Sequence, residues 1–501
     1  MAEGQSKPPD DSALNTLRPG TPFTAAMTVK FKRPASEETF LSAADSLERA
    51  ALRHGATSVV RQKRLMPADR EHTVQYELRE AWQSADAYRG YWGSEEFHRF
   101  RSTVHADLGT SAKLAFYQPS RPGPATGHAR APVPKTGQKQ CWDEHYKSFL
   151  PKPGDPRGRG QDGYYQAGQD WPDPRFTDNG DGTVTDRLTN LVWLKDADYF
   201  GEQTWTEALQ LAHKLHGGSR HCPKLNDHST PGQWRLPNIR ELLSLIDFGA
   251  EGHPILPCGH RFENYKSGKY WTSTSLVANA KIAWMMTLAL GPTVFDIKHK
   301  SNKTRLWPVR DGDQPSRVQK TGQTGYWDEG GNPLPPDDPL AAGQDGKLQK
   351  GVAATGRRFT VDENGVGTVT DHLTGLVWLK KGNPFEFLTW HEALEECAKL
   401  ADGDHGLKDG SAAGEWRLPN IREIESLVDY GKMGPCLPEG HPFSDPSDPL
   451  HSVQPSSYWT STSVTSGPSQ AMFIILGVGP AIFEYKGHRF FAWPVRNRRH
   501  R

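Results

Sequence analysis

The chain has 501 residues, of which 35% are hydrophobic, and its 60 basic side chains nearly balance 59 acidic ones. This balance gives no strong field for a phosphate backbone, so we expect no nucleic-acid partner. No apolar run approaches the roughly 18 residues of a membrane span, and the N-terminus is polar, so we expect neither membrane insertion nor a signal peptide. These features predict a cytoplasmic protein, with secretion without an N-terminal signal as the alternative.

The first part of the chain consists of a polar leader, residues 1–21, which we expect to be disordered, and a domain at residues 22–119. Apolar residues alternate from Ala25 to Phe31 and predict a strand, and the spacing after Ser36 predicts a helix that ends at Ala50. The remaining elements are strands at 58–65 and 73–82, a helix at 84–108 and a strand at 112–118. This βαββαβ order is typical of a ferredoxin-like sheet with both helices on one face, which commonly dimerises through the other face.

The stretch Tyr76–Trp82, with Ala87-Tyr88 and Ser94–Phe97, resembles the antibiotic-biosynthesis monooxygenase family of dimeric α+β barrels. The resemblance implies a cofactor-independent oxidation of a small aromatic or quinol substrate. Tyr91 stands where the family commonly has histidine, and the first strand lacks the asparagine of the haem-degrading branch. The resemblance therefore supports the fold more than the chemistry. Candidates for lining a barrel pocket are Trp82, Tyr91, Trp92 and His98.

The rest of the chain is a repeat. Trp234–Glu241, with the sequence WRLPNIRE, returns as Trp416–Glu423, an offset of 416 − 234 = 182 residues. A repeat of this length is a whole domain used twice and is too long for a solenoid unit. The parts of this region are a Pro/Gly-rich linker at 120–134, a first unit at 135–311, a short linker at 312–319 and a second unit at 320–497.

Each unit is expected to contain a hairpin, two helices and several short strands. The hairpin turns at Asn190 or Gly375, which are residue types that accept positive φ. The first helix starts at a Thr-x-x-Glu capping box, at Thr204 or Thr389. In the first unit it buries Trp205, Ala208, Leu209 and Ala212. The second helix has Asn238 as N-cap and Glu241 three residues later, and it buries Ile239, Leu242, Leu243 and Ile246. Further strands are expected at 270–274, 283–290, 293–298 and 305–309.

The ordered set of motifs in the two units resembles the Lcl C-terminal domain family. The motifs of the first unit are Gly182–Asp186, Thr189–Trp193, Trp234–Asn238, Tyr270–Thr274 and Trp307–Arg310, and the second unit repeats them. The resemblance implies an α+β fold related to C-type lectins and to the formylglycine-generating enzyme. It also implies glycan binding, because the named family member recognises sulfated glycans. Formylglycine chemistry needs a reactive cysteine pair late in the domain, and no cysteine follows Cys436, so we expect no catalytic residues.

A sulfated or acidic glycan would be held by Lys and Arg side chains. The candidates are Lys298, Lys300, Lys303, Arg305, Lys486, Arg489 and Arg496, for which the other interpretation is a solvated hairpin edge. The run from Asp178 to Gly182 has the spacing of a calcium loop, and a tight turn explains the same residues. The candidate metal ligands are Asp178, Asp181 and Asp186, and no other cofactor is expected.

Two further choices concern the interior of each unit. Trp234 and Trp416 are expected in the core, beside Arg235 and Arg417. These arginines pair either with Asp186 and Asp371 or with Glu241 and Glu423. Disulfides between Cys222 and Cys258 and between Cys397 and Cys436 are one interpretation of the cysteines, and small buried thiols are the other, which the lack of an export signal favours.

The sequence thus predicts an α+β protein with a ferredoxin-like α+β barrel domain followed by two C-type-lectin-like repeats. The predicted function is non-enzymatic binding of a glycan, with a homodimer formed through the first domain. One alternative is a monooxygenase that uses the first domain. The other is a scaffold whose repeats bind another protein.

Overall fold

The computed structural model divides the chain into two units, Met1–Thr126 and Gly127–Arg501. In the first unit it describes residues 23–31, 44, 51, 53, 56–65, 74–82 and 112–117. In the second unit it describes residues 131–498 except 153, 221, 252–254, 289–294 and 363–365. Among these residues, no helix is long and apolar enough to cross a membrane.

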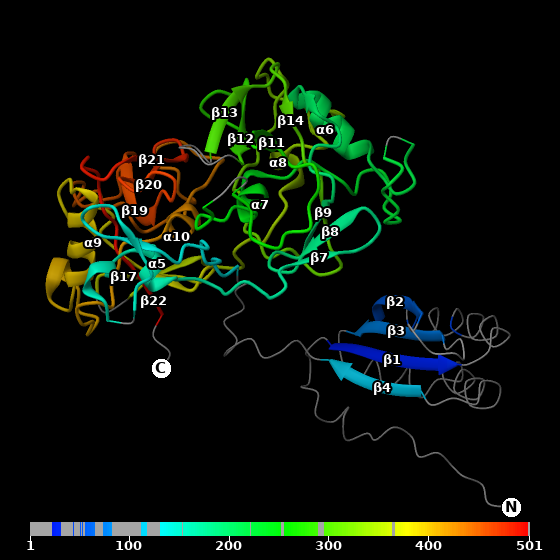
Figure 1. The fold of residues 1–501 in the computed structure, drawn as a ribbon, viewed down its shortest axis with the longest axis horizontal. Helices are drawn as coiled ribbons and strands as arrows, with labels where there is room; N and C mark the ends of the chain where they lie inside the picture. Colours follow the sequence, from blue (N-terminus) through cyan, green and yellow to red (C-terminus); the bar gives the residue numbers. More distant parts are fainter. Residues whose placement is uncertain are drawn as a thin grey trace, which may run out of the picture. The chain divides into compact units, whose positions relative to one another are not determined.

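The first unit contains an antiparallel sheet (Figure 1). Its strands are β1 (Phe23–Phe31), β2 (Ala56–Leu65), β3 (Val74–Trp82) and β4 (Ala112–Tyr117), in the order β2-β3-β1-β4. β1 lies between β3 and β4, with Met27 opposite both Leu78 and Leu114. This strand order is that of a ferredoxin-like βαββαβ fold, so the predicted sheet is confirmed. Ala44 is helical and buried, inside the first predicted helix.

The second unit is mixed α+β and consists mostly of sheet. The first repeat contains β5 (Cys141–Trp142), β6 (Ser148–Phe149), η1 (Pro156–Gly158), α5 (Asp162–Tyr165), β7 (Phe176–Asp178), β8 (Thr183–Asp186), β9 (Leu191–Leu194), β10 (Glu202–Gln203), α6 (Trp205–Lys214), α7 (Ile239–Ser244), β11 (Lys269–Ser275), β12 (Ile282–Thr287), β13 (Phe295–His299), β14 (Thr304–Arg305) and β15 (Val309–Asp311). The second repeat contains α8 (Asp345–Leu348), β16 (Phe359–Val361), β17 (Thr368–Asp371), β18 (Leu376–Leu379), α9 (Trp390–Lys399), η2 (Asp404–Gly406), α10 (Ile421–Glu425), β19 (Ser457–Ser463), β20 (Gln470–Ile475), β21 (Ala481–Tyr485) and β22 (Val495–Asn497).

Residues 175–311 and 358–497 form two copies of one fold, which we call the first body and the second body. The first sheet of each body contains the hairpin strands and the strand that closes the repeat. Its strand order is β15-β9-β8-β7 in the first body and β16-β17-β18-β22 in the second. A second sheet contains β11-β12-β13 or β19-β20-β21. The register of this sheet shifts between Trp271 and Ser275 in one body and between Trp459 and Ser463 in the other. The bodies therefore share topology and a local irregularity, as the sequence repeat predicts.

The two main helices of each body begin at the predicted caps. Thr204 accepts a hydrogen bond from the backbone N–H of Glu207 and starts α6, and Asn238 accepts one from Glu241 and starts α7. In both cases the glutamate bonds back to the N–H of the cap residue. Each box satisfies two N–H groups that a helix start leaves unpaired. The second body repeats both boxes at α9 and α10.

Tryptophan fills the interior of both bodies, and Trp234 and Trp416 are fully buried as predicted. Arg235 pairs with Glu241 at 2.6 Å, and Arg417 pairs with Glu423, which confirms the second of the two predicted pairings. Asp186 and Asp371 pair with other arginines, Arg175 at 2.8 Å and Arg358 at 2.9 Å. The five cysteines are free thiols, so the disulfide interpretation is wrong, and all except Cys258 are buried.

The segments before the bodies are exchanged between the repeats. We call residues 131–169 the first arm and residues 316–352 the second arm. In the sequence each arm precedes its own body, but α5 of the first arm packs on β19 of the second body, and α8 of the second arm packs on β11 of the first body (Figure 1). The boundaries of the sequence repeat therefore differ from the boundaries of the packed modules.

Buried polar contacts hold each arm on the opposite body. Asp162 Oδ2 accepts hydrogen bonds from Thr136 Oγ1 at 2.8 Å and from Thr462 Oγ1 at 2.7 Å. In the second arm, Asp345 Oδ2 accepts one from Thr274 Oγ1 at 2.7 Å. The amide of Gln138 bonds to both the N–H and the C=O of Ser463, as the amide of Gln323 does with Ser275. The same bonds occur in both exchanges because the same residues recur in both repeats.

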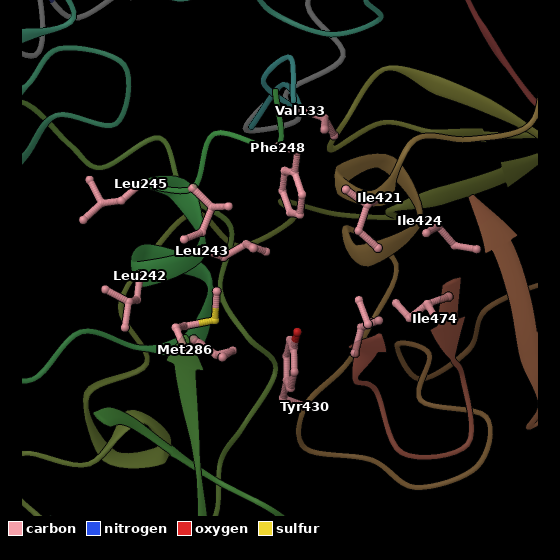
Figure 2. Packing of buried hydrophobic residues seen from close by; sticks show 14 of the residues in the cluster. Val133, Leu242, Leu243, Leu245, Phe248, Met286, Ile421, Ile424, Tyr430 and Ile474 are labelled. Carbon is pink, nitrogen blue, oxygen red and sulfur yellow. The ribbon is translucent and has the colours of Figure 1, made fainter. Parts of the chain in front are cut away.

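A shared apolar core also joins the bodies. Figure 2 shows Leu242, Leu243 and Leu245 of the first body on one side and Ile421 and Ile424 of α10 on the other, with Phe248 and Tyr430 between them. These residues belong to a continuous buried cluster that also includes residues of both main sheets. Because burial of apolar area is the main stabilising term in folding, we expect the two repeats to unfold together.

The buried arm aspartates predict a pH-dependent stability. Burial raises the pKa of Asp162 and of Asp345 to about 6, above the ordinary value of 3.8. Between these values the folded chain keeps protons that the unfolded chain releases, so these groups destabilise the fold as pH rises from about 4 to about 6. We expect the double variant Asp162→Asn/Asp345→Asn to gain stability relative to wild type over this window, by about 3 kcal/mol per group. Urea unfolding between pH 4 and pH 7 measures the difference.

The matched control is Asp337→Asn, which changes an exposed aspartate of the second arm. Its stability relative to wild type should not vary in the same way. A difference between wild type and the double variant that stays constant with pH would contradict the role of the buried carboxyl groups.

Candidate functional site

A cavity of about 300 Å³ lies in the surface of the first body, beside the loop that joins β7 and β8. Its position differs from every predicted glycan-binding position, and it includes Asp178 of the predicted calcium loop. The cavity is lined by Asp178, Gly180, Gly182, Leu194, Lys195, Asp196, Tyr199, Cys222, Lys224, Leu225 and Glu263.

Three charged side chains form one wall of this cavity. Lys195 Nζ lies 2.9 Å from Asp178 Oδ2 and 2.7 Å from Glu263 Oε1. Lys195 follows β9 and Asp178 ends β7, while the backbone N–H of Glu263 donates to the carbonyl of Lys195 at 2.8 Å. The hydrogen bond from Lys195 lowers the pKa of Asp178, and the bonds to Glu263 and Asp178 raise the pKa of Lys195. Asp178 and Lys195 are therefore both ionised at neutral pH.

Aromatic and aliphatic side chains and backbone atoms form the rest of the cavity lining. The half-buried Tyr199 packs edge-on against Phe200, with ring centroids 5.2 Å apart. Burial raises the pKa of the Cys222 thiol, which makes it a poor nucleophile. Gly182 has φ of +89°, and a Cβ there would meet the carbonyl oxygen of Lys224 at 2.5 Å, so this wall requires glycine. An aromatic ring beside fixed charged groups suits a ligand with both hydroxyl groups and an apolar face.

The second body has a smaller cavity, of about 80 Å³, at a related place. Lys380 occupies the position of Lys195, directly after the Leu-Val-Trp-Leu motif. His451 Nδ1 lies 2.6 Å from Asp448 Oδ1, and Lys381 Nζ lies 3.6 Å from Asp448 Oδ2. The cavity is lined by Lys380, Lys381, Pro442, Phe443, Asp445, Asp448, His451 and Ser452. The repeats therefore share the place of the cavity and differ in its charged groups.

Two of the predicted glycan-binding lysines are buried, which corrects their expected exposure. Lys300 is 0% and Lys486 is 1% exposed. Their ammonium groups lie 4.0 Å from the ring centroid of Trp205 and 3.9 Å from that of Trp390. Lys300 also donates to the carbonyls of Trp327 and Asp328 in the second arm. Lys300 therefore links the second arm to the first body, whereas Nζ of Lys486 is buried without a hydrogen-bond partner among the described residues. Neither lysine is placed to meet a glycan.

Three of the other predicted basic residues form ion pairs within their own body. Arg305 pairs with Asp198 and Glu202, Arg489 with Glu392, and Arg496 with Asp409. Lys303 is exposed. The side chain of Lys298 lies outside the described residues. Most of these charges are therefore already neutralised by carboxylates of the same body.

The three predicted metal ligands have separate environments. Asp178 belongs to the Lys195 cavity, and Asp181 accepts from the backbone and side chain of Thr183. Asp186 is fully buried and bound by Arg175 through both oxygens, which leaves the calcium prediction without its third carboxylate. Among the described residues, no three His, Cys, Asp or Glu side chains group closely enough to hold a metal ion. Calcium binding stays a prediction that rests on Asp178 and Asp181.

The predicted barrel pocket of the first unit lies outside the described residues. This applies to Tyr91, Trp92 and His98 and to the side chain of Trp82, of which the structure describes the backbone in β3. The monooxygenase alternative therefore stays a prediction.

The predicted calcium loop includes Asp178, Gly180 and Gly182 of the Lys195 cavity, and the other lining residues were not predicted as site residues. Lys195 and Lys380 end a repeated motif, so their shared position was a usable signal. Tyr199 and Glu263 come from loops that differ between the repeats, and nothing in their spacing indicates that they meet. Loops often carry binding residues for this reason, because they vary while the frame stays constant.

The model of the Lcl C-terminal domain matches residues 182–310 and 367–496, which is more than half of the chain. Each match covers most of one body, from β8 or β17 to the closing strand. The chain belongs to the Lcl C-terminal domain family. No curated protein matches it.

Solved structures show partial likenesses over about a fifth of the chain. The oxygenase SnoaB from Streptomyces nogalater, which is described as cofactor-independent, is 17% identical, and the match covers 21% of this chain and 98% of that one at a TM-score of 0.17. The protein PA3566 from Pseudomonas aeruginosa is 15% identical, with 21% and 100% covered at a TM-score of 0.17. A candidate antibiotic biosynthesis monooxygenase from Nitrosomonas europaea is also 15% identical, with 21% and 97% covered at a TM-score of 0.18.

The buried lysines predict a second pH window for stability. Burial lowers the pKa of Lys300 and of Lys486 to about 7, from an ordinary value of 10.5. Between these values the unfolded chain binds protons that the folded chain lacks, so the fold gains stability as pH rises. From pH 7 to pH 9.5 we expect the free energy of unfolding of wild type to rise by about 2 to 3 kcal/mol per lysine more than that of the double variant Lys300→Met/Lys486→Met. Urea unfolding at each pH checks this, with the exposed Lys303→Met as control, and parallel pH profiles would refute it.

Proposed function

We propose that this chain is a non-enzymatic binding protein whose Lcl C-terminal repeats hold glycans, with the cavity beside Lys195 as the first binding site. The observation that carries the proposal is the meeting of Tyr199, Lys195, Asp178 and Glu263 around one cavity of about 300 Å³. Sugar hydroxyls can donate to the carboxylates and accept from the lysine, while an aromatic ring supports the apolar face of a sugar ring.

The state of the charged groups supports binding without large rearrangement. Lys195 is held by carboxylates on both sides, so its position is set before a ligand arrives. Preorganised polar groups lose less conformational entropy on binding. The resemblance of the repeats to C-type lectins, inferred from their motifs, agrees with this use of the loops.

The charge of the cavity favours an uncharged or amino-bearing glycan. Asp178, Asp196 and Glu263 stand against Lys195 and Lys224, so a sulfate group would meet more negative than positive side chains. Sulfated glycans remain the alternative ligand, because the family resemblance implies them. Salt separates an uncharged glycan from a sulfated one, since binding of a sulfated chain weakens steeply with ionic strength and binding by neutral hydrogen bonds does not.

The test is a glycan array with the full chain at low and high salt, followed by calorimetric titration of the strongest ligand. We expect Tyr199→Ala and Glu263→Gln each to weaken binding about tenfold, the loss of about 1.4 kcal/mol that one good contact contributes. The control Glu439→Gln removes an exposed carboxylate of the second body and should leave affinity unchanged. Equal affinities for all variants, or an array without a bound glycan, would reject the proposal.

We further propose that the first unit joins two chains into a dimer. The structure shows a four-stranded sheet. If both predicted helices cover one face, the other face is left to be covered, and a second copy can cover it. Four repeats would then act together, and linked weak sites gain affinity when one ligand spans them. Light scattering should give twice the chain mass for the full protein and the single mass for residues 127–501. A monomeric full chain would exclude this arrangement.

A further inference from the structure

Two arginines occupy equivalent places at the contact between the bodies. Arg240 in α7 and Arg422 in α10 are 422 − 240 = 182 residues apart, the spacing of the repeat, and each is 5% exposed. Each reaches a carbonyl of the opposite body, Arg240 that of Val428 and Arg422 that of Ile246, both at 2.6 Å. Because the positions are equivalent, a difference in their partners is a real break in the symmetry of the repeat.

Arg240 has a complete set of partners. Its Nε lies 3.1 Å from Glu425 Oε1, and the Tyr430 hydroxyl donates to the same oxygen at 3.0 Å. Gln319 of the second arm accepts from Nη1 at 3.1 Å. A carboxylate thus compensates the buried charge, and further hydrogen bonds satisfy the guanidinium.

The equivalent partners of Arg422 are absent because three residues differ between the repeats. Leu243 stands at the position of Glu425, Phe248 at that of Tyr430, and Pro134 at that of Gln319. None of the three offers a side-chain acceptor. In the part of the chain that the structure describes, Nε of Arg422 is buried without a hydrogen-bond partner.

Nearby charged groups do not replace the missing carboxylate. Arg175 is close enough to repel Arg422, and its own charge is bound by Asp186. Asp247, Glu425 and Asp162 all attract Arg422 electrostatically. Each already has another partner: Asp247 accepts from the backbone of Gly249, Glu425 pairs with Arg240, and Asp162 accepts from two threonines. Burial, followed by repulsion from Arg175, lowers the pKa of Arg422 to about 10, so it remains a cation at neutral pH.

A pocket of about 60 Å³ lies beside Arg422, between the two bodies. A single water needs about 10 to 15 Å³ of such space, so the pocket has room for a group of several atoms. Arg240 and the exposed Arg317 also line it, and Glu425, already bound to Arg240, is its acidic lining residue. Leu243 and Val133 supply apolar walls. The charge of the lining is therefore positive.

We infer that this pocket binds a small anion, no larger than sulfate, which gives Arg422 the negative partner that Glu425 gives Arg240. A buried charge without a partner is strongly destabilising, and an anion that accepts from Nε relieves that cost. Chloride, sulfate and a small carboxylate share the required chemistry. The anion would join the two repeats at their contact, so this inference does not depend on the proposed glycan site.

The test is thermal unfolding of the full chain in sodium chloride, sulfate or acetate, each compared with sodium gluconate at equal ionic strength. Gluconate is too large for a pocket of this size. An anion at about 100 times its Kd should raise the Tm of wild type by about 3 °C above the gluconate value. The anion that gives the largest shift identifies the ligand among the three sources.

The control variants separate specific binding from general salt effects. Leu243→Glu/Phe248→Tyr rebuilds the Glu425 and Tyr430 arrangement beside Arg422, and Arg422→Met removes the charge. Both should lose the anion-specific shift and keep the response common to all salts. A second readout is the chloride NMR signal, which wild type should broaden and Arg422→Met should not. The wild-type measurement remains informative if one variant fails to fold. Equal Tm shifts in wild type and variants for all three anions would overturn the inference, and so would a lack of chloride broadening if chloride gives the largest Tm shift.

Discussion

The attachment of each arm to the opposite body is the constraint on which the rest of the second unit depends. Asp162 and Asp345 are fully enclosed carboxyl groups whose partners are threonines, one of them from the other repeat. In each group Oδ2 accepts the threonine bonds, while Oδ1 is buried without a hydrogen-bond partner among the described residues, so the bonds offset only part of the cost of burial. Once both arms are exchanged in this way, α7 and α10 meet and their apolar side chains form one core. The exchange therefore makes two domains in the sequence into one packed structure.

The exchange also explains the buried lysines. Lys300 directly follows β13 and Lys486 directly follows β21, where the sequence suggested a solvated hairpin edge. An arm covers each lysine, and a tryptophan of the body lies beneath it. The Lys300 contact with carbonyls of the second arm ties the end of β13 to a segment that follows the first body in the sequence. Cation–π contact compensates part of the desolvation of an ammonium group. A residue type that usually marks the surface is here part of the interior.

Duplication provided a common frame, and the two copies then diverged at a few positions. The cavity beside Lys195 and the one beside Lys380 occupy related places with different polar groups. At the contact between the bodies, Leu243 and Phe248 of the first copy stand at the positions that Glu425 and Tyr430 occupy in the second. Capping boxes, core tryptophans and the Arg–Glu pairs are the same in both. The copies therefore differ at the cavities and at the contact between the bodies, and they agree in these elements of the frame.

Much of the frame is local and was readable from the sequence alone. Thr204 and Asn238 start helices because their side chains bond to N–H groups three residues ahead, and Asn190 turns a hairpin because it accepts positive φ. The sheet of the first unit follows from alternation over short stretches. The exchange of arms, the burial of Lys300 and the missing partner of Arg422 depend on residues more than a hundred positions apart or on a neighbour from the other repeat. Only the tertiary structure decided these, because the contact residues Asp, Gln and Thr recur in both arms and both bodies, and the sequence does not state which arm meets which body.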